Sequence, residues 1–315
     1  MKKFIALLMA ALMVFAFAAC TNDSDPTEAD ATNESVDASA TEADATEDEA
    51  SEESTDASAL AAMTGVEDGV LTVAMECAYA PYNWTQSDDS NGAVAIKDTN
   101  EFANGYDVMM AKKICEANGW ELEIVRLDWD SLVPAVQVGT VDAVIAGQSM
   151  TEKRMKQVDF AGPYLYASIV CLVKADGELA DATSIADLKG KCTSQMSTIW
   201  YDNCLPQIEG AEIQAASESA PAMLMALETG AVDFVCTDMP TAQAAVIAYP
   251  DMMILSFEGE NGFEVDEGEI NIGISLMKGR TELKNAIDSA LEGMTADDFN
   301  TLMNEAIKIQ PLSQE

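Results

Sequence analysis

Histidine is absent from this chain of 315 residues, and basic residues are scarce: 16 Lys and Arg stand against 55 Asp and Glu, which gives a net charge of −39. The scarcity of basic residues argues against a nucleic-acid partner, since binding phosphates requires Lys and Arg in excess. The missing histidine, together with cysteine spacings that match no zinc pattern, argues against a metal site, and we expect no cofactor. No pair of nucleophile and base is recognisable, so nothing in the sequence points directly to catalysis.

Cysteine is present, but its pattern does not indicate disulfides. Several cysteines lie within apolar strand or helix patterns, where this residue behaves as a small apolar side chain. We therefore expect buried free thiols and predict no pairing, although an exported protein permits disulfides. The cysteines concerned are Cys77, Cys115, Cys171, Cys192, Cys204 and Cys236.

The one long apolar run before the folded part lies at the N-terminus. Lys2 and Lys3 precede an apolar run from Phe4 to Ala19, which is short for a membrane span of about 20 residues. A positive start, an apolar stretch and small residues before Cys20 are typical of a secretory signal, and they resemble a lipoprotein signal. We predict that residues 1–20 are a lipoprotein signal peptide and that Cys20 is lipidated, which anchors the protein on the extracellular face of the cell membrane, or in the periplasm of a Gram-negative host. An ordinary signal peptide with an incidental Cys is the alternative.

Residues 21–65 contain no aromatic residue, no Lys and no Arg, and consist mainly of Ala, Ser, Thr, Asp and Glu. Such a segment cannot bury enough apolar surface to offset its ordering entropy, and its like charges extend it. We predict a disordered acidic linker. It acts either as a spacer above the membrane or as a solvated tail without a partner.

The remaining chain alternates strand and helix patterns. This alternation predicts an α/β fold in which helices cover both faces of a parallel sheet, and the length suits two lobes better than one core. A polar stretch at 83–104 is predicted to be a hairpin insertion. Strands are predicted at 70–75, 121–126 and 141–146, and helices at 107–118 and 131–138.

An internal repeat supports two lobes built on one plan. Residues 135–144 and 226–235 share Ala, Gly, Val, Asp and Val at a fixed offset. Each copy predicts a helix, a glycine cap and a buried strand. Ligands of open α/β sheets bind beyond the C-terminal ends of strands, so the loops at 147–151 and 237–239 are predicted to face a ligand.

Six motifs follow one another through the predicted folded part: Gly105–Asp107, Asp128–Pro134, Gly139–Asp142, Ser149–Arg154, Val158–Tyr164 and Asp187–Lys191. In their order and spacing they resemble the extracellular solute-binding proteins, family 3, of polar amino acid ABC transporters. The resemblance implies a two-lobed, periplasmic-binding-protein-like α/β fold of type II, hinged by two crossover strands. It assigns residues 66–167 and 271–315 to lobe 1 and residues 168–270 to lobe 2. It further implies a monomer that captures a free amino acid and delivers it to the permease.

The resemblance also assigns the two ends of a zwitterionic ligand. Arg154 would hold the α-carboxylate, a role that suits a planar guanidinium with two parallel donors. Asp238, on the other lobe, would hold the α-ammonium, because a desolvated charge without a partner is costly. Ser149 would help to bind the head group. Thr151 either contacts the ligand or only caps the helix that begins there.

A helix N-terminus after a short strand forms a second candidate contact with the carboxylate. Family members often have Gly-Thr-Thr at this place, whereas this chain has Met196, Ser197 and Thr198. The missing glycine leaves the backbone geometry open, and helix capping alone is the alternative role for Ser197 and Thr198.

Aromatic residues and one acid are expected around the ligand side chain. Tyr79, Tyr82 and Trp129 are candidate walls, because aromatic faces hold aliphatic stems or cations, and a place in the core is the alternative for each. Glu76 ends the first strand, where related receptors carry an acid that faces the distal group of the ligand. This acid favours a basic amino acid, and a structural or solvated Glu is the alternative.

These residues predict the substrate-binding lipoprotein of an ABC importer, not an enzyme. The alternative is a cyclohexadienyl dehydratase-like enzyme, since some relatives of this fold have that activity and fold alone does not decide function. Glu76 or Asp238 could act there as acid or base.

Overall fold

The computed structural model describes residue 66 and residues 68–311. The predicted signal peptide, the predicted lipidation site Cys20 and the predicted linker at 21–65 therefore lie outside the described residues. Within the described part, no helix is both long and apolar enough to cross a bilayer.

The first sheet has five strands in the order β6, β1, β7, β14, β8. Strand β1 pairs in parallel with β6 and β7, whereas β14 runs antiparallel to β7 and β8. The predicted parallel sheet is therefore mixed, because the return strand β14 enters it from the opposite direction. The bounds are β1 Val70–Met75, β6 Glu121–Arg126, β7 Ala143–Val144, β8 Asp159–Leu165 and β14 Ile272–Leu276.

The second sheet repeats this plan with the order β11, β10, β12, β9, β13. Strand β10 pairs in parallel with β11 and β12, and β9 runs antiparallel to β12 and β13. We call the layers built on the two sheets the first and the second lobe. The bounds are β9 Ile169–Lys174, β10 Lys189–Thr193, β11 Gly210–Ile213, β12 Phe234–Asp238 and β13 Met252–Leu255.

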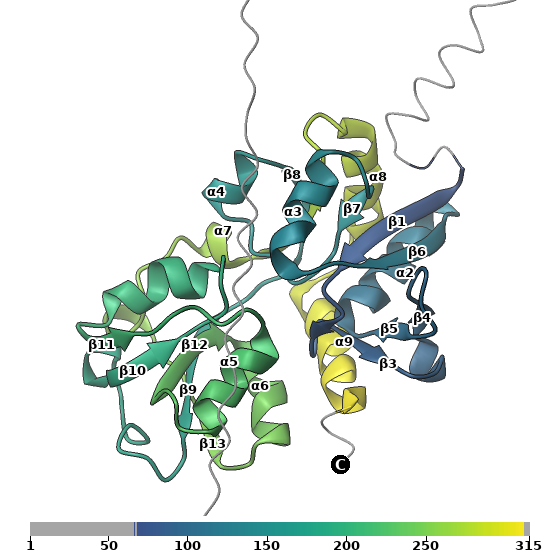
Figure 1. Ribbon diagram of the computed structural model, residues 1–315. Coiled ribbons are helices and arrows are strands. Elements are labelled where there is room, and N and C mark those ends of the chain that lie inside the picture. The colour runs from purple at the N-terminus through teal and green to yellow at the C-terminus, as the bar shows by residue number, and fades with distance from the viewer. Residues whose placement is uncertain (1–65, 67, 312–315) are drawn as a thin grey trace, which may run out of the picture. The chain divides into compact units, whose positions relative to one another are not determined.

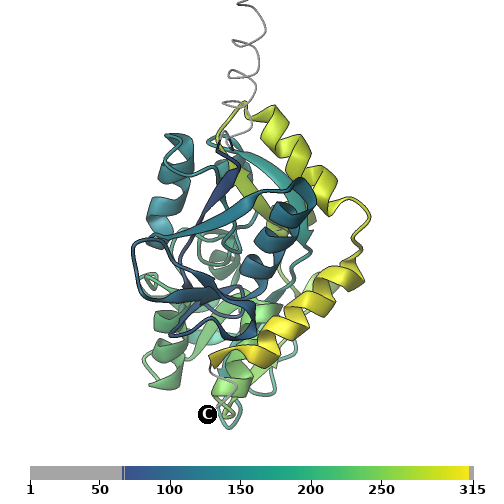
Figure 2. The same cartoon turned by 90° about the vertical axis from the view of Figure 1, so that its right-hand side faces the viewer.

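Helices flank both sheets (Figures 1 and 2). In the first lobe, α3 packs against β1, β7 and β14, whereas α2 and α8 pack together along β6 and β8. The chain runs from β1 through α2 to the neighbouring strand β6, and then through α3 past β1 to β7. The bounds are α2 Tyr106–Asn118, α3 Trp129–Gln137, α5 Ala220–Glu228, α6 Met239–Ala248, α8 Thr281–Leu291 and α9 Ala296–Ile309.

Local sequence signals set most of these element ends. Gly119 follows α2 with φ of 71° and Gly139 follows α3 with φ of 73°, the left-handed conformation of a C-terminal glycine cap. The strand predicted at 141–146 is shorter in the structure, because only Ala143 and Val144 pair regularly with β1. The polar insertion at 83–104 supplies β3 Asn83–Gln86, β4 Val94–Ala95 and β5 Phe102–Asn104, and these strands form a small antiparallel sheet with the preceding strand β2 Ala78–Tyr79.

The internal repeat has the same structural role in both lobes. Asp142 exchanges two hydrogen bonds with the backbone of Thr72, one through its N–H and one through its carboxylate. Asp233 does the same with the backbone of Lys191. In each copy the aspartate therefore fixes the start of one central strand, β7 or β12, against its neighbour.

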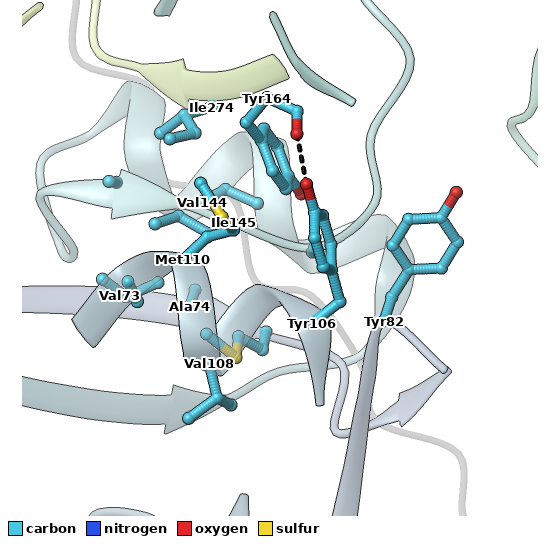
Figure 3. Packing of buried hydrophobic residues seen from close by; sticks show 14 of the residues in the cluster. Val73, Ala74, Tyr82, Tyr106, Val108, Met110, Val144, Ile145, Tyr164 and Ile274 are labelled. Atoms are coloured by element: carbon cyan, nitrogen blue, oxygen red, sulfur yellow. Dashed lines mark hydrogen bonds between the residues drawn. The ribbon is translucent and has the colours of Figure 1, made fainter. Parts of the chain in front are cut away.

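The cores are apolar and close-packed (Figure 3). In the first lobe, the Tyr106 and Tyr164 rings stack with centroids 5.7 Å apart, and the hydroxyl of Tyr106 donates to the carbonyl of Tyr164. In the second lobe, Cys171, Cys192, Cys204 and Cys236 belong to one apolar cluster. All six cysteines after residue 65 are buried free thiols, which confirms that expectation.

Candidate functional site

The predicted ligand-facing residues lie where central strands of the two sheets end. In the first lobe, Glu76 follows β1 and the loop 147–151 follows β7. In the second lobe, the segment 194–198 follows β10, and Asp238 is the last residue of β12. The two sheets therefore present matching C-terminal edges to one cleft, as expected for ligand sites of open α/β sheets.

Arg154 lies at the boundary between the lobes, on the short helix α4 (Glu152–Met155). One guanidinium nitrogen donates to the carbonyl of Ser149 at 2.8 Å and the other to the carbonyl of Ser197, across the cleft, at 2.8 Å. The guanidinium carbon lies 5.5 Å from the centroid of the Trp129 ring, within cation–π range. Burial lowers the pKa of Arg154 to about 10, so it stays charged at neutral pH.

Asp238 is the buried N-cap of α6. It accepts hydrogen bonds from the backbone N–H of Thr241 at 2.9 Å and from its hydroxyl at 3.1 Å. The Tyr79 hydroxyl donates to it from the first lobe at 2.8 Å. Burial raises the pKa of Asp238, whereas these donors lower it. The donors that hold the Asp238 carboxylate are therefore all uncharged, and its negative charge has no cationic partner among them.

Three aromatic rings of the first lobe, those of Tyr79, Tyr82 and Trp129, pack together at the cleft and form an aromatic wall. The rings of Tyr79 and Tyr82 lie 4.9 Å apart, and Tyr79 meets Trp129 edge-on at 6.0 Å. Gly147 lies against this pair, since a Cβ at that position would come within 3.1 Å of both tyrosine rings. The wall therefore requires a glycine at the start of the loop 147–151.

Three buried polar atoms in this region have no hydrogen bond of ordinary geometry within the described residues: Glu76 Oε2, Tyr82 Oη and Gln195 Nε2. Burial raises the pKa of Glu76 to about 7, Gln195 beside it lowers that value, and the charge of Asp128 raises it. The Tyr82 hydroxyl likewise lowers the pKa of Asp238, so these polar groups of the two lobes face one another.

Ser197 carries the unusual backbone conformation of the segment 194–198. Its φ is +56°, and its hydroxyl donates to Asp130 of the first lobe at 2.9 Å. Thr198 donates to the carbonyl of Gln195 and accepts from the backbone N–H of Tyr201, so it caps the helical turn that follows. Met196, which occupies the position of the usual family glycine, packs against the core of the first lobe.

Two smaller residues have structural contacts. Thr151 is the N-cap of α4 and accepts from the backbone N–H of Arg154 at 3.2 Å. Ser149 is buried, pairs by backbone with Ile272 and offers its carbonyl to Arg154. Both residues hold the loop that presents Arg154.

The structure divides the predicted residues into two groups. A cavity of about 500 Å³ lies on the outer side of the cleft and is lined by Trp129, Thr151, Arg154, Ser197 and Thr198, among others. The second group, formed by Glu76, Tyr79, Tyr82, Ser149 and Asp238, is buried and does not line this cavity. The edge-on contact between Tyr79 and Trp129 joins the two groups.

Sequence reasoning missed two residues of this region. Gln195 lies two positions before Ser197 in a strand-end loop, and the strand-end rule would have included it. Thr241 stands three residues after Asp238, the spacing of an N-cap and its backbone donor. Both were overlooked because an uncharged polar side chain gives little signal without its partners.

Comparison with known proteins identifies the class. The family model for bacterial extracellular solute-binding proteins, family 3, matches residues 71–307. This chain belongs to that family. Membership confirms the two-lobed fold class and the solute receptor, and it sets aside the dehydratase-like alternative.

Individual relatives support the same class. The L-cystine-binding protein TcyJ of Escherichia coli K12 is 26% identical over 240 residues, which cover 76% of this chain and 82% of TcyJ. An L-arginine-binding protein of Pseudomonas aeruginosa is 24% identical over 243 residues, 76% of this chain and 88% of that protein. The substrate-binding protein AbpA of Streptococcus pneumoniae, solved with L-arginine, is 25% identical with a TM-score of 0.62, over 79% of this chain and 98% of that chain.

Proposed function

We propose that this protein captures a free polar amino acid, preferably a basic one, between its two lobes and delivers it to the permease of an ABC importer. The lobes are assigned to residues 66–167 with 271–315 and to residues 168–270. The chain passes from the first sheet to the second between Leu165 and Ile169 and returns between Leu255 and Ile272, which supports this division and a hinge at these two crossings.

The observation that carries the proposal is the buried carboxylate of Glu76, whose Oε2 has no hydrogen bond of ordinary geometry within the described residues. A ligand side chain with several N–H donors would satisfy the acid, and an acceptor-poor cation such as a guanidinium suits a Glu whose ionised form it stabilises. The tyrosine rings of the wall offer faces for the aliphatic stem.

The two charged anchors take the ends of the zwitterion. Arg154 uses two of its five donors on the carbonyls of Ser149 and Ser197, and a ligand carboxylate would engage the guanidinium more strongly than a carbonyl does. Asp238 receives only neutral donors, so a ligand ammonium would supply the missing cation. Because the anchors lie on different lobes, a bound ligand bridges them and favours closure.

The remaining elements of the proposal concern location. The sequence around Cys20 supports lipidation of that residue, and the acidic segment 21–65 would separate the receptor from the membrane surface. A monomer suffices for this function, because both anchors come from one chain.

A thermal-shift screen of the common amino acids tests the function, since a ligand that binds only the folded state raises the melting temperature. Arginine, lysine, ornithine and histidine should give the largest shifts, and cystine and glutamine should be included because related proteins are specific for differing side chains. A protein whose melting temperature responds to no amino acid, with calorimetry also silent, would contradict the proposal.

A further inference from the structure

Asp107 is a fully buried carboxylate that does not line the cavity beside Arg154. It lies in the first turn of α2, where the helix dipole favours a negative charge. Within the described residues it has no ion-pair partner, and burial raises its pKa to about 6. Burying an acid without a cationic partner lowers the free energy of unfolding, so core packing alone does not explain an aspartate at this position.

Each oxygen of Asp107 accepts from a side chain that in turn accepts from a backbone amide. Oδ1 accepts from the hydroxyl of Tyr164 at 2.6 Å, and that hydroxyl accepts from the N–H of Gly147 at 3.0 Å. Oδ2 accepts from the amide of Asn83 at 2.7 Å, whose oxygen accepts from the N–H of Cys77 at 2.7 Å. Two hydrogen-bonded arms therefore lead from one carboxylate to two separate loops.

Both arms end beside ligand-facing residues. Cys77 follows Glu76 directly and has φ of +55°, a strained conformation for a residue with a side chain. Gly147 begins the loop that carries Ser149, and it supports the rings of the aromatic wall. The loops belong to different strands, β1 and β7, so sequence neighbourhood alone does not fix one relative to the other.

The backbone of α2 adds a third link to the same region. The N–H of Asp107 donates to the carbonyl of Tyr82 at 2.8 Å, and that of Tyr106 donates to the carbonyl of Pro81 at 3.1 Å. Figure 3 shows the side chains of Tyr82, Tyr106 and Tyr164 near one another at this end of the core. The N-terminus of α2, the turn that carries Tyr79 and Tyr82 (the aromatic turn) and β8 therefore meet around the carboxylate of Asp107.

We propose that Asp107 is a positioning residue that fixes the Glu76–Cys77 turn and the Gly147–Ser149 loop in their ligand-binding arrangement through two independent arms, Asn83 and Tyr164. The inference rests on the proposed function for its effect on affinity. Its effect on the two loops is independent of any ligand.

Four variants separate positioning from general stability. Asp107→Ala removes both arms, and Asn83→Ala breaks the Cys77 arm. Tyr164→Phe removes the hydroxyl that joins Asp107 to Gly147, although the Gly147 N–H also lies near enough to Asp107 to lower its pKa directly. Asp142→Asn is the control, because Asp142 is another hydrogen-bonded aspartate of the first lobe but accepts from the backbone N–H of Thr72, toward the opposite end of β1. Amide hydrogen exchange in the ligand-free full chain and calorimetric affinity for the best ligand of the screen are measured for each.

The exchange pattern is specific to two arms. Tyr164→Phe should accelerate exchange at Gly147 by about tenfold or more and leave Cys77 unchanged, and Asn83→Ala should do the reverse, because local opening follows the local hydrogen bonds. Affinity should fall by about threefold or more for each single arm and by about tenfold or more for Asp107→Ala, as for other residues that support a binding site from behind. The control should change neither quantity.

Several outcomes would overturn the inference. Equal acceleration at both amides in every variant, or acceleration spread over the whole lobe, would reduce Asp107 to a core residue. Unchanged affinity in variants whose loops exchange faster would do the same. If Asp107→Ala does not fold, the two single-arm variants decide. If the unsubstituted protein binds no amino acid, the proposed function fails, while the exchange pattern still accepts or rejects the two-arm arrangement.

Discussion

Three buried carboxylates near the cleft differ in the partners that surround them, and these differences assign their roles. Asp107 is saturated by neutral donors within the first lobe. Asp238 also has neutral donors, one of which reaches it from the opposite lobe. Glu76 has an oxygen without any ordinary hydrogen bond. Asp107 and Asp238 are both satisfied by neutral donors, whereas Glu76 keeps an oxygen that an additional donor can engage.

The two anchors should contribute most of the affinity for the ligand backbone. Arg154→Ala or Asp238→Asn should weaken binding roughly 30- to 5000-fold, since truncating one partner of a buried charge pair costs about 2–5 kcal/mol. Asparagine retains an oxygen that can cap α6, so the second variant isolates the loss of charge. Calorimetry measures both, with Arg126→Ala as a control because Arg126 forms an exposed ion pair with Glu101. Normal binding by folded variants would show that the proposed anchors are wrong.

Glu76 should make the affinity for a cationic ligand depend on pH. Its pKa is raised to about 7, so the acid is largely protonated below that pH and ionised above it. A cationic side chain binds the ionised form, and affinity should therefore rise by up to about tenfold per pH unit toward pH 7 and level off near pH 8. Binding near pH 6 should also release a proton. Titrations in buffers of different ionisation enthalpy measure both effects.

Two comparisons make the pH test specific. Glu76→Gln should lower affinity for the cationic ligand and flatten its pH dependence over this range, and a neutral ligand should show little dependence. The same raised pKa predicts that the contribution of Glu76 to stability without ligand is full below pH 4.5 and is lost as the pH rises through 7. A Glu76→Gln variant with an unaltered pH profile would assign the dependence to another group.

At the scale of elements, the residue before α2 packs so closely against the aromatic turn that it has no room for a side chain. Gly105 has φ of +126°, and a Cβ there would overlap the carbonyl oxygen of Tyr82 and lie 2.9 Å from the Cα of Asn83. Gly119, at the other end of α2, has φ of +71° but open space around its Cα. A side chain at Gly119 would therefore cause backbone strain alone, whereas one at Gly105 would also collide with the aromatic turn.

Gly105→Ala should lower both the free energy of unfolding and the ligand affinity, because the turn that carries Tyr79 and Tyr82 must move. Gly119→Ala should cost about 1–2 kcal/mol of unfolding free energy through backbone strain alone. Its ligand affinity should stay unchanged. Denaturant unfolding and calorimetry on the pair measure the difference, and equal losses of affinity would refute the proposed contact between α2 and the turn.

At the scale of the whole molecule, side chains connect the lobes across the cleft. Tyr79 reaches Asp238, Arg154 reaches the carbonyl of Ser197, and Lys153 pairs with Asp202 at 3.3 Å. The first two of these contacts use the groups proposed to bind the ligand. If these groups bind the ligand as proposed, binding would exchange contacts between lobes for contacts with the ligand, and the closure free energy would depend on the difference between them.

The proposed lipidation of Cys20 is tested on the full-length chain in cells. Cys20→Ala should shift the protein from the membrane fraction to the soluble or secreted fraction, because a lipidated Cys20 would be its firm attachment. The purified receptor domain should bind its ligand with unchanged affinity. Fractionation measures the first and calorimetry the second, and undiminished membrane association of the variant would argue against lipidation.

Local features of the sequence were sufficient for much of the fold. The ends of α2 and α3 follow from glycines that adopt the left-handed conformation, and the repeated Gly-Thr/Ala-Val-Asp segment indicated two sheets of one plan. The rule that ligands bind at strand ends led to the loops 147–151 and 237–239, which include Asp238, whereas the roles of Arg154 and Glu76 came from the resemblance to the family. These signals are local or periodic, so they are readable in a single chain.

Contacts between distant segments were decided only by the tertiary structure. Whether the Tyr79 hydroxyl reaches Asp238, and whether Arg154 reaches the carbonyl of Ser197, depends on residues far away in the chain. The role of Asp107 emerges only when β1, β7 and β8 bring Cys77, Gly147 and Tyr164 together. The sequence does not show which groups surround a carboxylate in the folded protein. Its protonation and its role depend on its burial and on its hydrogen-bond donors, which only the folded structure determines.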